Sequence, residues 1–140
     1  MEERQQIRKC MICRIEGQEY FCVSVQGGVR RVDPSSVLAL KQSLRDVDIF
    51  ISEKMGGKIR KALVETRGKL QDYYKTLSGC GENFYLCYSY CAVNFNRVRM
   101  IDTNEKKVVF DDNRAIEMGA NSIAKTKKAY IKYMSRRCGK

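Results

Sequence analysis

Apolar and polar side chains alternate with a period of two near the start of the chain. Because successive side chains of a β-strand point to opposite faces, this alternation predicts strands at residues 7–15, 19–25 and 29–32. The second and third of these are separated by Gly27-Gly28, and glycine reaches the positive φ angles of tight hairpin turns without strain. The pattern therefore predicts a three-stranded antiparallel meander.

The period changes to that of a helix after Asp33-Pro34. Aspartate caps free N–H groups at a helix start, and proline is preorganised for the first helical turn. The apolar residues that follow are spaced alternately by three and four positions, as on one helix face: Val37, Leu40, Leu44, Val47 and Ile51. A second stripe of this kind, beyond a break at Gly56-Gly57, predicts another helix over residues 58–77.

The period of two returns at Asn83. It predicts strands at residues 84–95, 98–102 and 107–110, which would form a second meander. An amphipathic segment follows and predicts a final helix over residues 114–136, with its lysines turned outward.

Each half of the chain is thus expected to hold three strands, an aspartate-containing junction and a helix. The predicted fold class is α+β, with two antiparallel three-stranded meanders, each followed by a helix, and an extra central helix. We expect one domain over residues 1–140, in which residues 7–52 and 83–137 form a pseudo-dimer around a connector helix at 53–82. Residue identity between the halves is slight, so chance recurrence of the layout is the alternative to a duplication.

The start of the first predicted helix resembles a known family. Residues 32–48, VDPSSVLALKQSLRDVD, are similar to the strand-to-helix segment of the positive-cofactor-four family of transcription coactivators. The resemblance implies a curved antiparallel sheet followed by a helix, a homodimer, and binding of single-stranded DNA across the sheets. This chain departs from the family in its short third strand, its extra helix and its basic C-terminal rather than N-terminal segment.

Positive charge dominates the chain. Lys and Arg number 27 against 16 Asp and Glu, and residues 118–140 carry seven of the cations and no acid. Such a field attracts polyanions, of which nucleic acid is the commonest in cells. An acidic protein partner is the main alternative, and an anionic membrane surface is a further one.

No apolar run approaches the roughly 20 residues of a membrane span, and no secretory leader opens the sequence. We therefore expect no membrane insertion and an intracellular location, in the nucleus or the cytoplasm.

Single-stranded nucleic acid is held by cations along its phosphates and by aromatic rings that stack on its bases. The predicted strands carry both arginines and tyrosines, and the basic side chains of the final helix could contact phosphates. The candidate contacts in the first half are Arg14, Tyr20, Arg30 and Arg31. Those in the second half are Tyr85, Arg97, Arg99, Lys106, Lys107, Lys125, Lys127, Lys128, Lys132, Arg136 and Arg137. Tyr88 and Tyr90 are weaker candidates, because they share a strand face with apolar residues and favour core packing.

Catalytic chemistry has little support in the sequence. The chain contains no histidine, which removes the commonest general base and the usual catalytic triads. It also lacks a glycine-rich phosphate loop and a nucleophile motif. The sequence therefore favours a non-enzymatic protein that binds single-stranded nucleic acid, of a type that would suit a virus, acting in transcription, replication or RNA handling. The rival hypothesis is a basic adaptor that binds an acidic protein.

The chain contains seven cysteines. Their odd number and the missing leader favour a reducing compartment over a disulfide framework. Cys10 and Cys13 have zinc-knuckle spacing, and Cys87 and Cys91 could complete a four-thiolate site. In regular strands, however, the first two point to opposite faces and the second two lie about 13 Å apart. Buried thiols are therefore the preferred interpretation, with zinc as the alternative.

Overall fold

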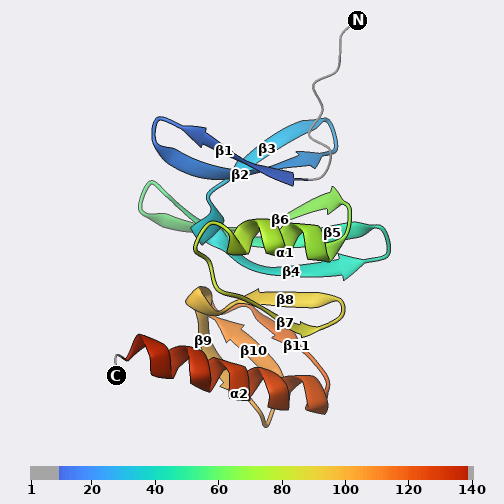
Figure 1. Cartoon of the computed structure of the whole chain (residues 1–140), viewed down its shortest axis with the longest axis vertical. Coiled ribbons are helices and arrows are strands. Elements are labelled where there is room, and N and C mark those ends of the chain that lie inside the picture. The colour runs from blue at the N-terminus through green and yellow to red at the C-terminus, as the bar shows by residue number, and fades with distance from the viewer. Residues whose placement is uncertain (1–9, 139–140) are drawn as a thin grey trace, which may run out of the picture.

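Three antiparallel sheets lie one above another in the computed structural model, which describes residues 10–138 (Figure 1). The first sheet consists of β1 (Cys10–Ile15), β2 (Gln18–Val25) and β3 (Gly28–Val32). The central sheet has the order β6 (Lys58–Arg67), β5 (Asp46–Met55), β4 (Val37–Ser43), β8 (Cys91–Asn94) and β7 (Phe84–Tyr88). The third sheet has the order β11 (Ala115–Glu117), β10 (Lys107–Phe110) and β9 (Val98–Asp102).

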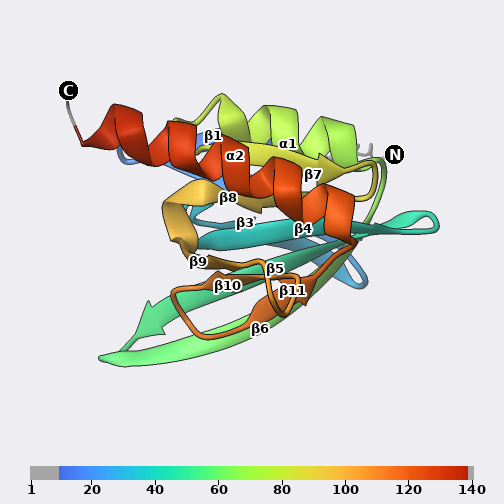
Figure 2. The same cartoon turned by 90° about the horizontal axis from the view of Figure 1, so that it is seen from below.

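Within the described residues, two α-helices, α1 (Leu70–Ser78) and α2 (Ala120–Arg137), lie on the same side of the molecule, beside the β7 edge of the central sheet (Figure 2). Two short 3-10 helices, η1 (Pro34–Ser36) and η2 (Phe95–Arg97), lead into β4 and β9. The fold class is therefore α+β, with mostly antiparallel sheets.

Both faces of the central sheet are covered around β4. On one face, β4 and β5 pack with the first sheet and α1, through residues that include Leu40, Ile49, Phe21 and Tyr73. On the other face, β4 and β8 pack with the third sheet and α2, through residues that include Leu38, Val93 and Phe110. Burial of both faces explains why β4 begins with the continuous apolar run Val37–Leu40 rather than with an alternating pattern.

The helix predicted for residues 33–51 is wrong, because these residues form η1, β4 and the first part of β5. The carboxylate of Asp33 does cap a turn, accepting from Ser35 N at 3.0 Å, but only the short η1 follows. A β-bulge between Val37 and Ala39 breaks the period of two in β4. It places Val37 and Leu40 in the same cluster, three positions apart, which is a helical spacing. The segment that resembles the coactivator family therefore does not run from strand to helix.

The helix predicted for residues 58–77 is wrong over its first half. Residues 58–67 form β6, and only Leu70, Tyr73 and Leu77 form a buried helical stripe, in α1. The connector helix expected at 53–82 is therefore also wrong over its first half, and α1 is its only helical part among the described residues. Gly56 and Gly57, with φ angles of +59° and +82°, make the two-residue hairpin turn that joins β5 to β6.

The second half of the chain also differs from its predicted layout. The strand expected at 84–95 folds back as the β7–β8 hairpin and joins the central sheet. β11 occupies the beginning of the helix expected at 114–136, so α2 begins only after its N-cap residue, Gly119. β3 leads into a strand whereas β11 leads into a helix, so the structure gives the pseudo-dimer no support.

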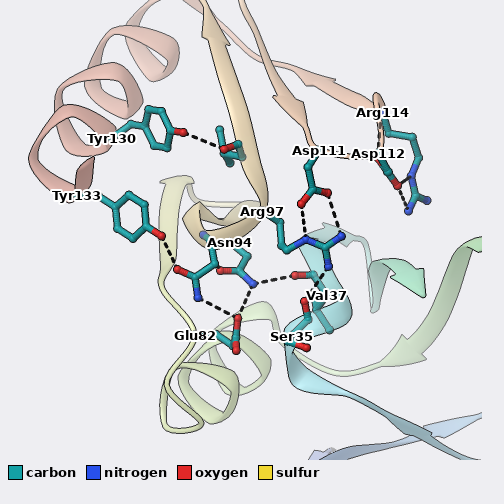
Figure 3. Close-up of polar contacts among 12 residues, drawn as sticks. Ser35, Val37, Glu82, Asn94, Arg97, Asp111, Asp112, Arg114, Tyr130 and Tyr133 are labelled. Atoms are coloured by element: carbon teal, nitrogen blue, oxygen red, sulfur yellow. Dashed lines mark hydrogen bonds and ion pairs between the residues drawn. The ribbon is translucent and has the colours of Figure 1, made fainter. Parts of the chain in front are cut away.

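A buried ion pair fastens the third sheet to the central sheet. The carboxylate of Asp112, which is 1% exposed, accepts hydrogen bonds from Arg114 N at 3.0 Å and Arg114 Nε at 2.9 Å (Figure 3). The other guanidinium nitrogens of Arg114 donate to the carbonyl oxygens of Ala62 and Ile51. Arg114 therefore links the β10–β11 loop to both strands of the β5–β6 hairpin.

This ion pair predicts an acid-sensitive fold. Burial alone raises the pKa of Asp112, but hydrogen bonds and positive charge from Arg114 outweigh it and hold that pKa below its ordinary value. Such a group contributes stability above its unfolded-state pKa of about 3.9 and loses that contribution as the pH falls through its folded-state pKa. The free energy of urea unfolding should therefore fall less steeply toward acid in Asp112→Asn than in the unaltered protein. Equal pH dependence in the two proteins would contradict this role.

Candidate nucleic-acid interface

Three of the arginines predicted to contact nucleic acid are paired with acids, and two of them lie in the first sheet. Arg14 contacts Glu19 at 2.8 Å across β1 and β2. Arg30 of β3 contacts Glu53 of β5 at 3.2 Å, which links the first sheet to the central one. A guanidinium that already neutralises a carboxylate has less to offer to a phosphate.

Arg97 of η2 is held more firmly still. Its Nε and one terminal nitrogen donate to the two carboxylate oxygens of Asp111 at 2.7 and 2.9 Å, and its other nitrogen donates to Ser35 O at 2.8 Å (Figure 3). The side chain is only 23% exposed. Arg97 therefore holds η1 and the end of β10 together.

Two of the predicted stacking rings are also engaged. The ring of Tyr85 stacks on Phe95, with centroids 5.3 Å apart and planes inclined by 16°. The guanidinium of Arg31 lies 4.3 Å from the centroid of the Tyr20 ring. Neither tyrosine belongs to an open row of rings such as a single strand would need.

The remaining candidates lie on the third sheet and α2. Arg99 donates to Asn113 Oδ1 at 3.0 Å, and Lys107 stands between Asp102 and Glu117 in the strand register. Four cations form an exposed outer stripe on α2: Lys125, Lys128, Lys132 and Arg136. Lys127 lies with Lys106 along a groove beside the β9–β10 turn, and Arg137 contacts Asn96 and the Tyr133 ring. The predicted contacts are thus spread from the first sheet at one end of the stack to α2 at the other (Figure 1).

A different group of side chains gathers where three connections meet. These are the β4–β5 turn, the β6–α1 junction and the β7–β8 turn, which together line a cleft of about 580 Å³. We call the exposed lining residues that come before α1 or lie in the β7–β8 turn the loop-end cluster: Leu44, Arg45, Arg67, Lys69, Ser89 and Tyr90.

Gln42 holds the three connections together. Its side-chain nitrogen lies within hydrogen-bond distance of the carbonyl oxygens of Leu44, Asp46 and Gly68, at 2.9 to 3.1 Å. Its side-chain oxygen accepts from Leu70 N at 2.7 Å, at the start of α1, and its backbone N–H donates to Tyr90 O at 2.8 Å. The side chain of Gln42 therefore positions the β4–β5 turn and the β6–α1 junction, and its backbone N–H positions the β7–β8 turn.

Gly68 allows the β6–α1 junction to pass close to the core. Its φ is +145°, and a Cβ atom there would lie 2.8 Å from the ring of Tyr73, which is fully buried. The Tyr73 hydroxyl donates to Arg67 O at 2.6 Å, and Gly68 N donates to Arg45 O at 3.0 Å. The backbone of both arginines is thus fixed although their side chains are exposed.

The loop-end cluster offers unneutralised positive charge. None of Arg45, Arg67 and Lys69 forms an ion pair within the part of the chain that the structure describes, although Asp46 stands opposite Arg67 in the register. Among the described residues, no acid lines the cleft.

Two exposed nonpolar side chains flank these cations. Leu44 is 96% exposed and has a φ of +57°, which is uncommon for leucine, and Tyr90 is 60% exposed. Strained backbone and exposed apolar side chains at loop tips are features of binding surfaces.

Sequence reasoning missed this cluster because it placed Arg45, Arg67 and Lys69 on helices. The available signal was local: Arg67-Gly68-Lys69 interrupts the second stripe, and glycine inside a periodic segment often marks a turn. Tyr90 was considered, but its assignment to the core is wrong because it lies in the β7–β8 turn.

The cysteines do not assemble as the zinc alternative requires. The sulfur atoms of Cys13 and Cys22 are in disulfide contact between β1 and β2, so the expectation that Cys13 is a free thiol is wrong. Burial raises the pKa of Cys87 to about 11 and that of Cys91 to about 12. The side chain of Cys10 lies outside the described residues. Among the side chains that are described, no three of His, Cys, Asp or Glu are grouped to hold a metal ion.

No helix within residues 10–138 is long and apolar enough to cross a membrane.

Comparison with known proteins gives a likeness in structure only. Neither models of protein families nor curated protein sequences matched the chain. Among solved structures, the fold is similar to one described as "LytTr DNA-binding domain of putative methyl-accepting/DNA response regulator from Bacillus cereus". The two chains are 15% identical and superpose with a TM-score of 0.53, over 86% of this chain and 97% of the other. The chain therefore shares the fold of that domain.

Proposed function

We propose that this chain is a non-enzymatic DNA-binding module whose loop-end cluster contacts the phosphate backbone. The observation that carries the proposal is the convergence of Arg45, Arg67 and Lys69 on loops fixed by Gln42 and Gly68; none of the three has an ion-pair partner among residues 10–138. Function is commonly carried on loops that a rigid scaffold positions, and unpaired guanidinium and ammonium groups are the usual ligands of phosphate.

The fold likeness supports this proposal from another direction. The similar structure from Bacillus cereus is described as a DNA-binding domain. A shared fold alone does not carry function, but it agrees with the positive charge of +11 and with the exposed cationic loops.

Duplex DNA is the better fit to this site. A single strand would be held by several rings that stack on successive bases. Tyr85 and Tyr20 are engaged within the protein, and Tyr90 is the exposed ring in the loop-end cluster. Three cations on protruding loops suit the regularly spaced phosphates of a duplex groove.

The test is a fluorescence-anisotropy titration of a labelled duplex, and of each of its separated strands, over a series of salt concentrations. We expect the duplex to bind more tightly than either strand, with the logarithm of its affinity falling linearly with the logarithm of salt concentration. No affinity for any oligonucleotide at low salt would overturn the proposal. Tighter binding of the single strands would restore the hypothesis drawn from the sequence and remove the duplex assignment.

A further inference from the structure

The β5–β6 hairpin projects from the rest of the molecule, away from the two helices (Figure 2). β6 is an edge strand of the central sheet, with β5 as its neighbour. Its inner end is covered, because the Thr66 hydroxyl donates to Ser24 O of β2. In its outer half, residues 58–61, every side chain is exposed. An edge of this kind presents backbone N–H and C=O groups to which another strand can be added.

The outer part of the hairpin is strongly basic. Residues 54–64 contain Lys54, Lys58, Arg60 and Lys61 and no acidic residue. The preceding acid, Glu53, is paired with Arg30. Lysine on an edge strand discourages self-association, because like charges directly opposite each other in a ladder are destabilising. A second copy of this strand is therefore a poor occupant of the edge.

The two faces of β6 differ in character. Ile59 and Leu63, which are 56% and 51% exposed, share one face with the exposed Lys61, which lies between them. Lys58 and Arg60 share the opposite face. A strand added to this edge would place its own alternate side chains beside these two rows. Complementarity then requires acidic side chains on the face of Lys58 and Arg60, and apolar side chains beside Ile59 and Leu63 on the other face.

We propose that residues 58–63 form a docking edge for an extended acidic segment of another protein, in which acidic and apolar residues alternate. Binding by strand addition takes affinity from the backbone ladder and specificity from alternate side chains. The positive charge of the hairpin favours an acidic segment. The exposed Ile59 and Leu63 favour a peptide over a nucleic acid, because a nucleic acid has no peptide backbone with which to extend the hydrogen-bond ladder. This surface is separate from the loop-end cluster, so the proposal stands independently of DNA binding.

The probe is a fluorescein-labelled synthetic peptide of alternating glutamate and valine, titrated into the full chain and followed by anisotropy. One comparison peptide has the same composition with all glutamates first and all valines last. Another has alternate backbone nitrogens methylated on the pairing edge. We expect each comparison peptide to bind about tenfold more weakly than the alternating one. The block peptide cannot place its glutamates on one face of the strand and its valines on the other, and the methylated peptide loses several backbone hydrogen bonds to β6.

Variants of the protein provide the matching comparison. Lys58→Glu with Arg60→Glu should weaken binding of the alternating peptide about tenfold, whereas Lys125→Glu with Lys132→Glu, the same charge change on α2, should leave it nearly unchanged. Equal binding of all three peptides would mean that the surface attracts acidic peptides by charge alone, without strand addition, and would overturn the proposal. A Lys58→Glu, Arg60→Glu variant that loses duplex binding but keeps peptide binding would assign the hairpin to nucleic acid instead.

Discussion

Replacing Arg45, Arg67 and Lys69 together by glutamine should weaken duplex binding about a hundredfold at moderate salt. Each phosphate contact that is lost should also reduce the slope of log affinity against log salt by about 0.9, because fewer counterions are released on binding. The three side chains are exposed and make no ion pairs within the described chain, so their removal should leave the fold intact. The measurement is anisotropy of a labelled duplex over a salt series, with circular dichroism to check the fold.

The matched control removes the same charge from the outer stripe of α2. The triple variant Lys125→Gln, Lys132→Gln and Arg136→Gln should weaken binding only a few-fold, through the loss of long-range attraction. If the helix variant instead weakened binding as much as the loop variant, the phosphate anchor would lie on α2, as the sequence alone indicated. The loop-end cluster would then lose its role.

Gly68→Ala is expected to cost about 2–4 kcal/mol of unfolding free energy, the largest effect on stability that we predict for a change of one methyl group. The φ of +145° belongs to a region that residues with a Cβ atom rarely adopt, and the new Cβ would lie 2.8 Å from Tyr73 Cε2. The Tyr73 ring is fully buried and cannot move aside without disturbing the core. Urea unfolding followed by circular dichroism measures the loss.

Gly28→Ala is the control for this substitution. Its φ is not in the positive range and no atom lies within 4 Å of the added Cβ, so its free energy of unfolding should change by less than about 0.5 kcal/mol. At temperatures where Gly68→Ala remains folded, it should also bind the duplex more weakly, because the junction that carries Arg67 and Lys69 is displaced. Unaltered stability of Gly68→Ala would mean that the junction is not fixed by its approach to Tyr73.

Local patterns located many strands but misread the central sheet. β9 and β10 lie where alternation predicts them, because their ends coincide with the polar turn around Asn104. The bulge in β4 and the β4–β5 turn together imitate a helical stripe from Val37 to Ile51, so spacing alone could not distinguish a bulged hairpin from a helix. The full exposure of Leu44 within that stripe is visible only once the strands are paired.

The candidate site depended on contacts that no local pattern reveals. Gln42, Gly68 and Tyr90 are far apart in the sequence and meet because β4 pairs with both β5 and β8. The prediction of a polyanion partner rests on composition, which depends on no particular fold. Which cations remain available to bind phosphate depends on which of them the fold pairs with acids, as it pairs Arg97 with Asp111.

The most direct test of the account is to map the DNA-contacting residues by NMR, titrating the isotope-labelled protein with a short duplex. We predict that the largest amide shift changes fall on the β4–β5 turn, the β6–α1 junction and the β7–β8 turn, around Arg45, Lys69 and Tyr90. Shift changes concentrated on the outer stripe of α2 or on the first sheet, with these three connections unperturbed, would contradict it.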